Sequence, residues 1–197
     1  GAAAKLSPAA AADAVRQLLP LDALIIHLDL PLVIAVAAAE AARDAGVRVI
    51  LNASPAPREP LQVVQRLMPH VSAIVLNRQE AGQFLGRVPA RGDLAHAART
   101  LGGMGPEHVL ITAGAEGAVA WDGREAYEQS AFAVPAIDKT GAGDAFLGAY
   151  TVLTAQSLEL PDVLLCACAA GAMAASKPGL LDSLPNLADV EAFLERQ

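Results

Sequence analysis

Short apolar runs alternate with alanine-rich segments of helical periodicity along most of the chain. Runs rich in Ile, Leu and Val predict strands, and the segments between them favour helices. Strands are predicted at 23–30, 47–53, 72–77 and 108–114, and a hairpin or meander at 117–123 and 125–134. Helices are predicted at 31–46, from 78 to near Gly86, and at 93–103, 145–156, 160–177 and 187–197.

This alternation of strand and helix predicts an α/β fold in which helices cover a mostly parallel sheet. No internal repeat and no clear linker interrupt the pattern, so a single domain is the simplest interpretation. Ligands of open parallel sheets bind beyond the carboxyl ends of the strands. Polar residues stand at or just after the predicted strand ends, and they are Asp29, Asn52, Asn77, Thr112 and Asp138.

Charge and composition exclude several classes of protein. The net charge of −7 argues against a nucleic-acid or anionic-membrane surface. Charged residues interrupt the long apolar runs, so no membrane-spanning segment is expected. Only two cysteines occur, Cys166 and Cys168, and their spacing on a helix does not favour a disulfide. These features predict a cytoplasmic protein.

The turn Gly141-Ala142-Gly143, followed by Asp144, enters an apolar helical segment. Small residues at a helix start expose backbone N–H groups at the positive end of the helix dipole, which suits a phosphate. Asp144 is placed to accept a proton from an attacking hydroxyl. On spacing alone, a tight turn with Asp144 as a helix cap explains the same residues.

Three motifs bear a family resemblance: DKTGAGDAFLGAY, VLNRQEAGQFLG and VLITAGAEGA. Together they resemble the signature set of the ribokinase-like, PfkB-type carbohydrate kinases. IIHLDLP, LNASPAP and SKPGLLDSLP resemble the ribokinase branch of that family. The resemblance implies a three-layer α/β/α sandwich, with residues 1–197 as its C-terminal nucleotide-binding and catalytic portion.

The resemblance also implies a reaction and roles within it. The expected activity is ATP-dependent phosphorylation of a sugar hydroxyl, with D-ribose converted to ribose 5-phosphate. Asp144 is the implied base and contacts the sugar, and Gly141, Ala142 and Gly143 form the anion hole. Asn77 and Glu80 match an Asn-x-x-Glu pattern that helps to place Mg²⁺ and the nucleotide phosphates. Without the family, the same pair is interpreted as a helix N-cap with its partner glutamate.

Further positions match the family's nucleotide and cation loops. The segment carrying Thr112, Gly114, Glu116 and Gly117 resembles the loop that passes close to ATP. Cys168 lies on the segment expected to line the adenine pocket, although a small core residue explains it as well. A monovalent cation, K⁺, is implied at a site formed mostly by carbonyl oxygens. The matching positions are Asp138, Thr140, Ala174, Lys177, Gly179 and Ser183.

The chain departs from the family pattern in three places. Lys139 stands where a small residue is usual, which an outward-facing side chain would make harmless. Asp29 stands where a sugar-contacting glutamate is expected. The family's N-terminal portion, with its lid and most sugar contacts, has no counterpart, and the first residue is not Met. We expect a second copy of the chain or a missing N-terminal segment to cover the sheet that this leaves exposed.

This third departure keeps a second hypothesis open, in which the chain is a catalytically silent nucleotide-binding or interaction module. A nucleotide-dependent dehydrogenase is a poorer fit, because no glycine fingerprint follows the first predicted strand. The four histidines, among them His27 beside Asp29, show no metal-ligand spacing and are interpreted as structural or surface residues.

Overall fold

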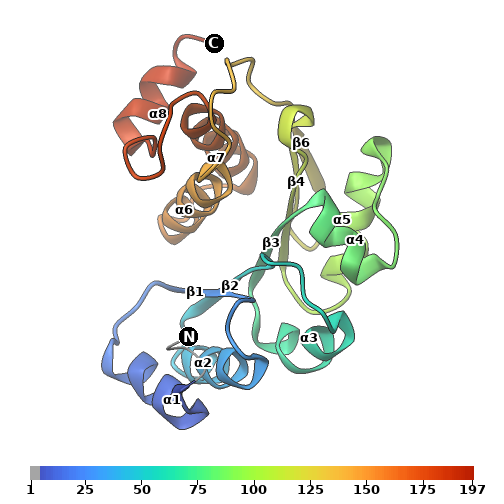
Figure 1. Ribbon diagram of the computed structural model, residues 1–197, viewed down its shortest axis with the longest axis vertical. Helices are drawn as coiled ribbons and strands as arrows, with labels where there is room; N and C mark the ends of the chain where they lie inside the picture. The colour runs from blue at the N-terminus through green and yellow to red at the C-terminus, as the bar shows by residue number, and fades with distance from the viewer. Residues whose placement is uncertain (1–4) are drawn as a thin grey trace. The chain divides into compact units, whose positions relative to one another are not determined.

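The computed structural model describes residues 5–197, so Gly1–Ala4 at the start of the segment GAAAKLSP lie outside the described residues. The chain divides into two compact units. The first runs to Ile111 and includes Trp121–Ala126, and the second contains Thr112–Ala120 and Tyr127–Gln197. Figure 1 traces the course of the chain through both units.

The first unit is built on parallel strands with helices between them. Its elements are α1 (Pro8–Gln17), β1 (Ala23–His27), α2 (Leu32–Asp44), β2 (Arg48–Asn52), α3 (Pro60–Arg66), β3 (Ala73–Asn77), α4 (Arg78–Leu85), α5 (Leu94–Gly102) and most of β4 (His108–Thr112). Strand β1 pairs in parallel with β2, and β2 in parallel with β3. Helices α1 and α2 pack side by side (Figure 1). The parallel β-α-β pattern predicted from hydrophobic periodicity is therefore confirmed.

The strands carry the core of this unit. Val49, Ile50 and Leu51 of β2 are fully buried, as are Val109, Leu110 and Ile111 of β4. Continuous apolar runs of this kind are typical of parallel strands covered on both faces. The six strands follow the order β1-β2-β3-β4-β5-β6, with β5 at Ala118–Trp121 and β6 at Ala126–Gln129. Strand β1 is thus an edge strand, and it places His27 opposite Asn52 at its carboxyl end.

The second unit is mainly helical. It contains α6 (Ala142–Ala155), α7 (Leu160–Ala175) and α8 (Leu187–Leu194), which lie together in the orange and red part of Figure 1. Its core includes Ala145 from α6, Ala169 and Met173 from α7, and Val190 from α8. Small residues allow α6 and α7 to approach closely, because a side chain at Gly171 would lie 3.1 Å from the carbonyl oxygen of Ala142. The start of α6 is therefore held by packing against α7.

Two helices were missed by the hydrophobic pattern, and several boundaries differ. Helix α1 begins at a recognisable signal, because Ser7 caps it by accepting the N–H of Ala10 at 3.1 Å and Pro8 follows. Helix α3 has only 7 residues and begins at Pro60. The predicted strand at 125–134 ends at Gln129, and the helix predicted at 145–156 begins three residues earlier, at Ala142. The strand predicted at 23–30 ends at His27, which leaves Asp29 in a turn.

The hairpin predicted around Asp122-Gly123 is present. The N–H of Asp122 donates to the carbonyl of Glu125 at 3.2 Å, and the Asp122 carboxylate accepts the N–H of Arg124 at 2.8 Å. Neither Cys166 nor Cys168 forms a disulfide, as expected. Among residues 5–197, no helix combines the length and apolar character needed to cross a membrane.

His108, at the start of β4, gives the first unit a testable pH dependence. Burial and the nearby Arg48 guanidinium lower its pKa below the usual 6.5, against smaller opposing effects of Glu107 and Asp122. Below pH 6.5 the unfolded chain therefore takes up a proton more readily than the folded one. The free energy of unfolding should then decrease as the pH is lowered. We expect urea unfolding between pH 7 and pH 5 to show this loss, and His108→Gln to flatten the slope. The matched control is His96→Gln on the exposed face of α5, and equal slopes in both variants would contradict the prediction.

Candidate active site

The turn before α6 is held by backbone hydrogen bonds. The N–H of Thr140 donates to Asp138 Oδ1 at 2.9 Å, and the N–H of Ala142 donates to the carbonyl of Lys139 at 3.2 Å. Gly141 is the N-cap residue with a φ of +80°, a conformation that glycine adopts without strain. Asp144 is thus the third residue of the helix, within its first turn.

The start of α6 presents unpaired donors. Within residues 5–197, the N–H groups of Gly143 and Asp144 have no acceptor. They lie at the positive end of a helix of 14 residues, where an anion is stabilised by both the donors and the dipole. The geometry therefore leaves two backbone donors at the turn where the sequence predicts an anion hole, and anion binding there stays a prediction.

Asp144 does not act as a helix cap. In α4 and α8 the acidic residue at the same third position folds back onto the N-cap N–H, with Glu80 Oε2 at 2.8 Å from Asn77 N and Asp189 Oδ2 at 3.2 Å from Asn186 N. Asp144 is exposed and makes no such bond in the described chain. The capping interpretation of Asp144 is therefore wrong, and its carboxylate is left available to accept a proton.

The two glycines of the turn are needed for different reasons. A side chain at Gly141 would lie 2.7 Å from Cδ1 of Leu180 and would require a strained positive φ, so the fold itself demands glycine there. Gly143 has an ordinary helical backbone, and a side chain added to it would meet nothing within 4 Å. Packing therefore does not explain this second glycine.

Gly143→Ala is accordingly expected to separate function from stability. Alanine favours a helix over glycine by up to about 1 kcal/mol, so thermal unfolding should be unchanged or slightly delayed. The added methyl group would stand beside the unpaired N–H groups, and we expect sugar-dependent ADP release to fall at least about tenfold. Gly148→Ala, also unobstructed in α6, is the control and should keep activity. Normal turnover in Gly143→Ala would argue against phosphate contact at this position.

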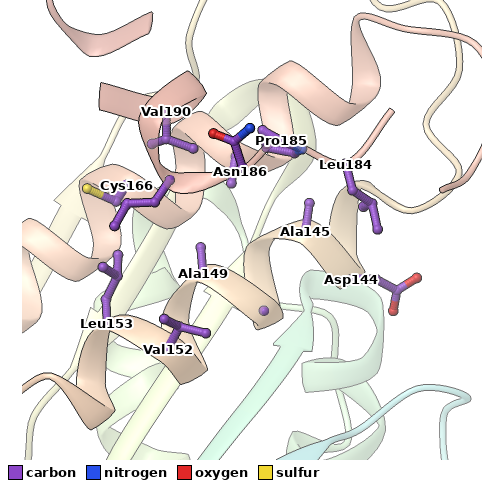
Figure 2. A pocket seen from close by; sticks show the side chains of 13 residues that line it. Asp144, Ala145, Ala149, Val152, Leu153, Cys166, Leu184, Pro185, Asn186 and Val190 are labelled. Carbon is purple, nitrogen blue, oxygen red and sulfur yellow. The ribbon is translucent and has the colours of Figure 1, made fainter. Parts of the chain in front are cut away.

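An apolar cavity of about 230 Å³ runs along α6 (Figure 2). Asp144 lies at one end of it, with the carboxylate pointing away from the apolar side chains. Its walls come from α6, α7 and α8, and they include Ala149, Cys166 and Val190. Asn186, a polar residue of the wall, uses its side-chain oxygen to accept the N–H of Asp189 at 2.9 Å. The donors for an anion are therefore those at the helix start rather than those in the cavity.

Asn77 and Glu80 form a complete capping box at the start of α4. Asn77 Oδ1 accepts the N–H groups of Gln79 and Glu80 at 2.8 and 2.9 Å, and Glu80 returns the bond to Asn77. Glu80 is buried, with 8% of its surface exposed. The capping interpretation is thus correct, and it leaves Glu80 Oε1 as the carboxylate oxygen without a described hydrogen bond. No group of three or more His, Cys, Asp or Glu side chains within residues 5–197 could hold a metal alone.

The segment predicted as a nucleotide loop is a tight turn in the second unit. Gly114–Glu116 form a single 3-10 turn after β4, and the N–H of Ala113 donates to the carbonyl of Gly117 at 2.8 Å. Thr112 ends the strand, and Glu116 has a partner of its own. Cys168 is partly buried on α7, and burial raises the pKa of its thiol to about 12, so it stays protonated. Contact of these residues with ATP stays a prediction.

The positions predicted for a monovalent cation lie on two neighbouring loops of the second unit. The N–H groups of Ile137 and Asp138 donate to the carbonyl of Ala175 at 2.8 and 3.2 Å, which holds the loops together. Hydrogen bonds from Thr140, and a weaker one from the N–H of Gly179, lower the pKa of Asp138, so it is an anion. Lys139 is exposed, which is the condition under which we expect this departure from the family to be harmless.

The remaining cation positions differ in exposure. Ala174 and Ser183 are fully buried, and Ser183 Oγ donates to the carbonyl of Leu180 at 2.8 Å. Lys177 is exposed and contributes its N–H to the carbonyl of Ala174 at 3.3 Å. An ionised carboxylate beside loop carbonyl groups is a donor set that suits a hard cation.

The second unit therefore brings together the α6 turn and the cation loops, while the first unit carries Asp29, Asn77 and Glu80. Asp29 is exposed in the turn that follows β1. His27, which the sequence analysis interprets as a structural or surface residue, contacts Asn52 at the adjacent strand end, with 3.3 Å between Nδ1 and Nδ2.

Comparison with known proteins decides the family. Residues 1–187 match the pfkB family carbohydrate kinases. The chain belongs to this family. Among curated relatives of this pfkB chain, Haemophilus influenzae ribokinase is 31% identical over 196 residues, which cover 99% of the chain and 63% of the relative. Salmonella typhi deoxyribokinase is 27% identical over 195 residues, covering 98% of the chain and 63% of the relative.

Ribokinase of Schizosaccharomyces pombe is 32% identical over 173 residues, which cover 85% of this pfkB chain and 53% of the relative. The chain thus spans less than two thirds of the length of these relatives. Arabidopsis thaliana ribokinase complexed with ribose and ATP matches with a TM-score of 0.81 and 23% identity, covering 93% of this chain and 59% of that one. Cryptococcus neoformans ribokinase in complex with ADP matches with a TM-score of 0.77 and 25% identity. That match covers 91% of this chain and 61% of that one. The predicted ribokinase-like α/β fold is confirmed.

Proposed function

We propose that this chain carries the phosphoryl-transfer portion of an ATP-dependent sugar kinase. The reaction moves the γ-phosphoryl group of ATP to a sugar hydroxyl, with D-ribose converted to ribose 5-phosphate. The observation that carries the proposal is the uncapped Asp144 carboxylate beside the unpaired N–H groups of Gly143 and Asp144 in a pfkB-family chain. The two ribokinase structures named above, with ribose and ATP and with ADP, support the choice of ligands.

Each group at the start of α6 has a defined task in this reaction. The N–H groups of Gly143 and Asp144 donate hydrogen bonds to oxygens of the transferred phosphoryl group, where negative charge develops. Asp144 accepts the proton of the attacking sugar hydroxyl as the oxygen–phosphorus bond forms and the bond to the ADP oxygen breaks. Helix packing holds both groups in one turn, so base and donors need no rearrangement before transfer.

Two ions accompany this proposal. Mg²⁺ would neutralise nucleotide phosphate charge, and Glu80, through its remaining Oε1, would hold the ion by way of water. K⁺ would strengthen the positive field near the turn, and the Asp138 carboxylate with the neighbouring loop carbonyls would hold it. The residues present fit both ions in donor chemistry, because all of these ligands are oxygen atoms. Asn77 supports this arrangement by fixing the start of α4.

The nucleotide contacts are proposed from the same family membership. The turn of Thr112, Gly114, Glu116 and Gly117 would pass close to ATP, and Cys168 would line the adenine pocket with a neutral thiol. Asp29 and Asp144 are the proposed sugar contacts. No nucleic acid and no membrane partner is proposed, and the cytoplasmic location stays a prediction from composition.

A further proposal concerns the edge of the sheet. Strand β1 is hydrogen-bonded to β2 and ends the strand order, and Ile25 on it is 38% exposed. An exposed edge of this kind favours pairing with another strand. We propose that a second copy of the chain, or a further segment corresponding to the part of the relatives that this chain does not span, covers it.

The test is sugar-dependent ADP release by the 197-residue chain with Mg-ATP, K⁺ and D-ribose. Turnover that depends on ribose would support the kinase. ATP binding without turnover would favour the second hypothesis, a silent nucleotide-binding module, which the coverage of less than two thirds of the relatives keeps open. Absence of ATP binding would contradict both.

A further inference from the structure

The ends of β1 and β2 are joined by a side-chain hydrogen bond whose direction can be deduced. Asn52 Oδ1 accepts the N–H of Ser54 at 3.2 Å. A backbone N–H can only donate, so the amide oxygen of Asn52 faces Ser54 and its NH₂ group faces His27. The distance of 3.3 Å between Asn52 Nδ2 and His27 Nδ1 is therefore a bond that the amide donates.

This direction fixes the proton on the His27 ring. An amide NH₂ group has no acceptor capacity, so His27 Nδ1 must carry the lone pair. The ring is then the neutral tautomer with its proton on Nε2. Within residues 5–197, Nε2 has no hydrogen-bond partner, although the side chain is half-buried.

No structural hydrogen bond within residues 5–197 uses this donor. Strands β1 and β2 are already paired over five residues, so the side-chain bond is not needed to join them. His70 has Glu40 as a partner at 3.5 Å, and His96 is exposed to water. His27 differs because one ring nitrogen is fixed by a neighbouring strand and because the residue ends β1, at the carboxyl end of the parallel strands, where ligands of such sheets bind.

We propose that His27 Nε2–H donates a hydrogen bond to a hydroxyl of the acceptor sugar. This inference rests on the proposed function and adds a specificity-determining residue to it. Asp29, two residues further along, supplies an exposed acceptor at the same strand end. A hydroxyl group both donates and accepts, so a neutral donor beside a carboxylate suits a polyol rather than a charged ligand. Asn52 is the positioning residue, because it holds the proton on Nε2.

The first measurement is the ribose affinity of the 197-residue chain by calorimetry, with His27→Leu, His27→Gln and the control His96→Leu. Leucine removes the donor, and we expect about tenfold weaker ribose binding with ATP affinity unchanged. Glutamine keeps an N–H near the position of Nε2 and should stay within about threefold of the unchanged chain. Unchanged ribose affinity in His27→Leu, or no ribose binding by the unchanged chain, would overturn the inference.

A second measurement needs no substitution at His27. In the ¹⁵N-histidine spectrum of the unchanged chain at pH 7.5, we expect a protonated Nε2 and an unprotonated Nδ1 for His27, and a shift of the Nε2 signal on addition of ribose. A proton on Nδ1, or ribose binding without that shift, would refute the assignment. His96 is the internal control and should not respond.

The inference and the proposed function fail in different ways. Ribose binding that depends on His27, without any ADP release, would leave the inference standing and remove the kinase activity of this chain. ADP release with a ribose KM that is unaffected by His27→Leu would support the kinase activity and remove the inference about His27.

Discussion

Asp144→Asn is expected to reduce sugar-dependent ADP release by about a thousandfold, within the range usual for loss of a general base. Asparagine keeps the size of the side chain and cannot accept the hydroxyl proton. Because Asp144 makes no capping bond in the described chain, the substitution removes no structural hydrogen bond. ATP affinity should stay within about threefold, since the N–H donors of the turn remain. Initial rates of ADP release and calorimetric titration of ATP measure the two quantities.

Asp162→Asn is the matched control for this variant. Asp162 is also exposed and also occupies the third position of a helix, α7, that begins without a side-chain cap. Both substitutions remove a carboxylate from a helix N-terminus and should cost a similar, small amount of stability, about 0.3–1 kcal/mol. Asp162→Asn should retain full turnover. Equal turnover in the two variants would exclude Asp144 as the base, whatever the unfolding data show.

Gly117→Ala is expected to be the most destabilising single-methyl change in the second unit. Gly117 has φ of +100° and ψ of −142°, a region reserved for glycine. Its added methyl group would overlap the carbonyl oxygen of Gln129 and lie 2.8 Å from the backbone nitrogen of Ala131. These are backbone atoms of β6 and the segment after it, which cannot rotate away. We expect a loss of about 3 kcal/mol or more, measured by urea unfolding.

Gly114→Ala separates backbone strain from steric overlap. Gly114 also has a positive φ, +60°, but an added methyl group would meet nothing within 4 Å. The left-handed conformation alone should cost about 1–2 kcal/mol. Similar losses in both variants would show that the β6 backbone does not press on Gly117. Packing against β6 thus explains glycine at 117, whereas no such contact explains glycine at 143.

Local patterns in the sequence determined the α/β class, the parallel strands and the turn that ends at Asp144. The Asn77 and Glu80 capping box could be predicted because both of its bonds lie within four residues. Helix α1 could have been found from Ser7 and Pro8, whereas α3 is too short to show a clear periodicity. Information of this kind is present in sequence because the interactions that produce it span one turn of chain.

Only the tertiary structure decided which of these residues are free to act. Glu80 and Asp144 occupy the same helical position, yet one folds back onto its own helix start and the other does not. Gly117 and Gly143 look alike in sequence, and only the first meets the backbone of a distant segment. The proton of His27 is placed by Asn52, 25 residues away and on another strand. Each of these outcomes depends on atoms that folding brings together across the chain, and no local pattern encodes such contacts.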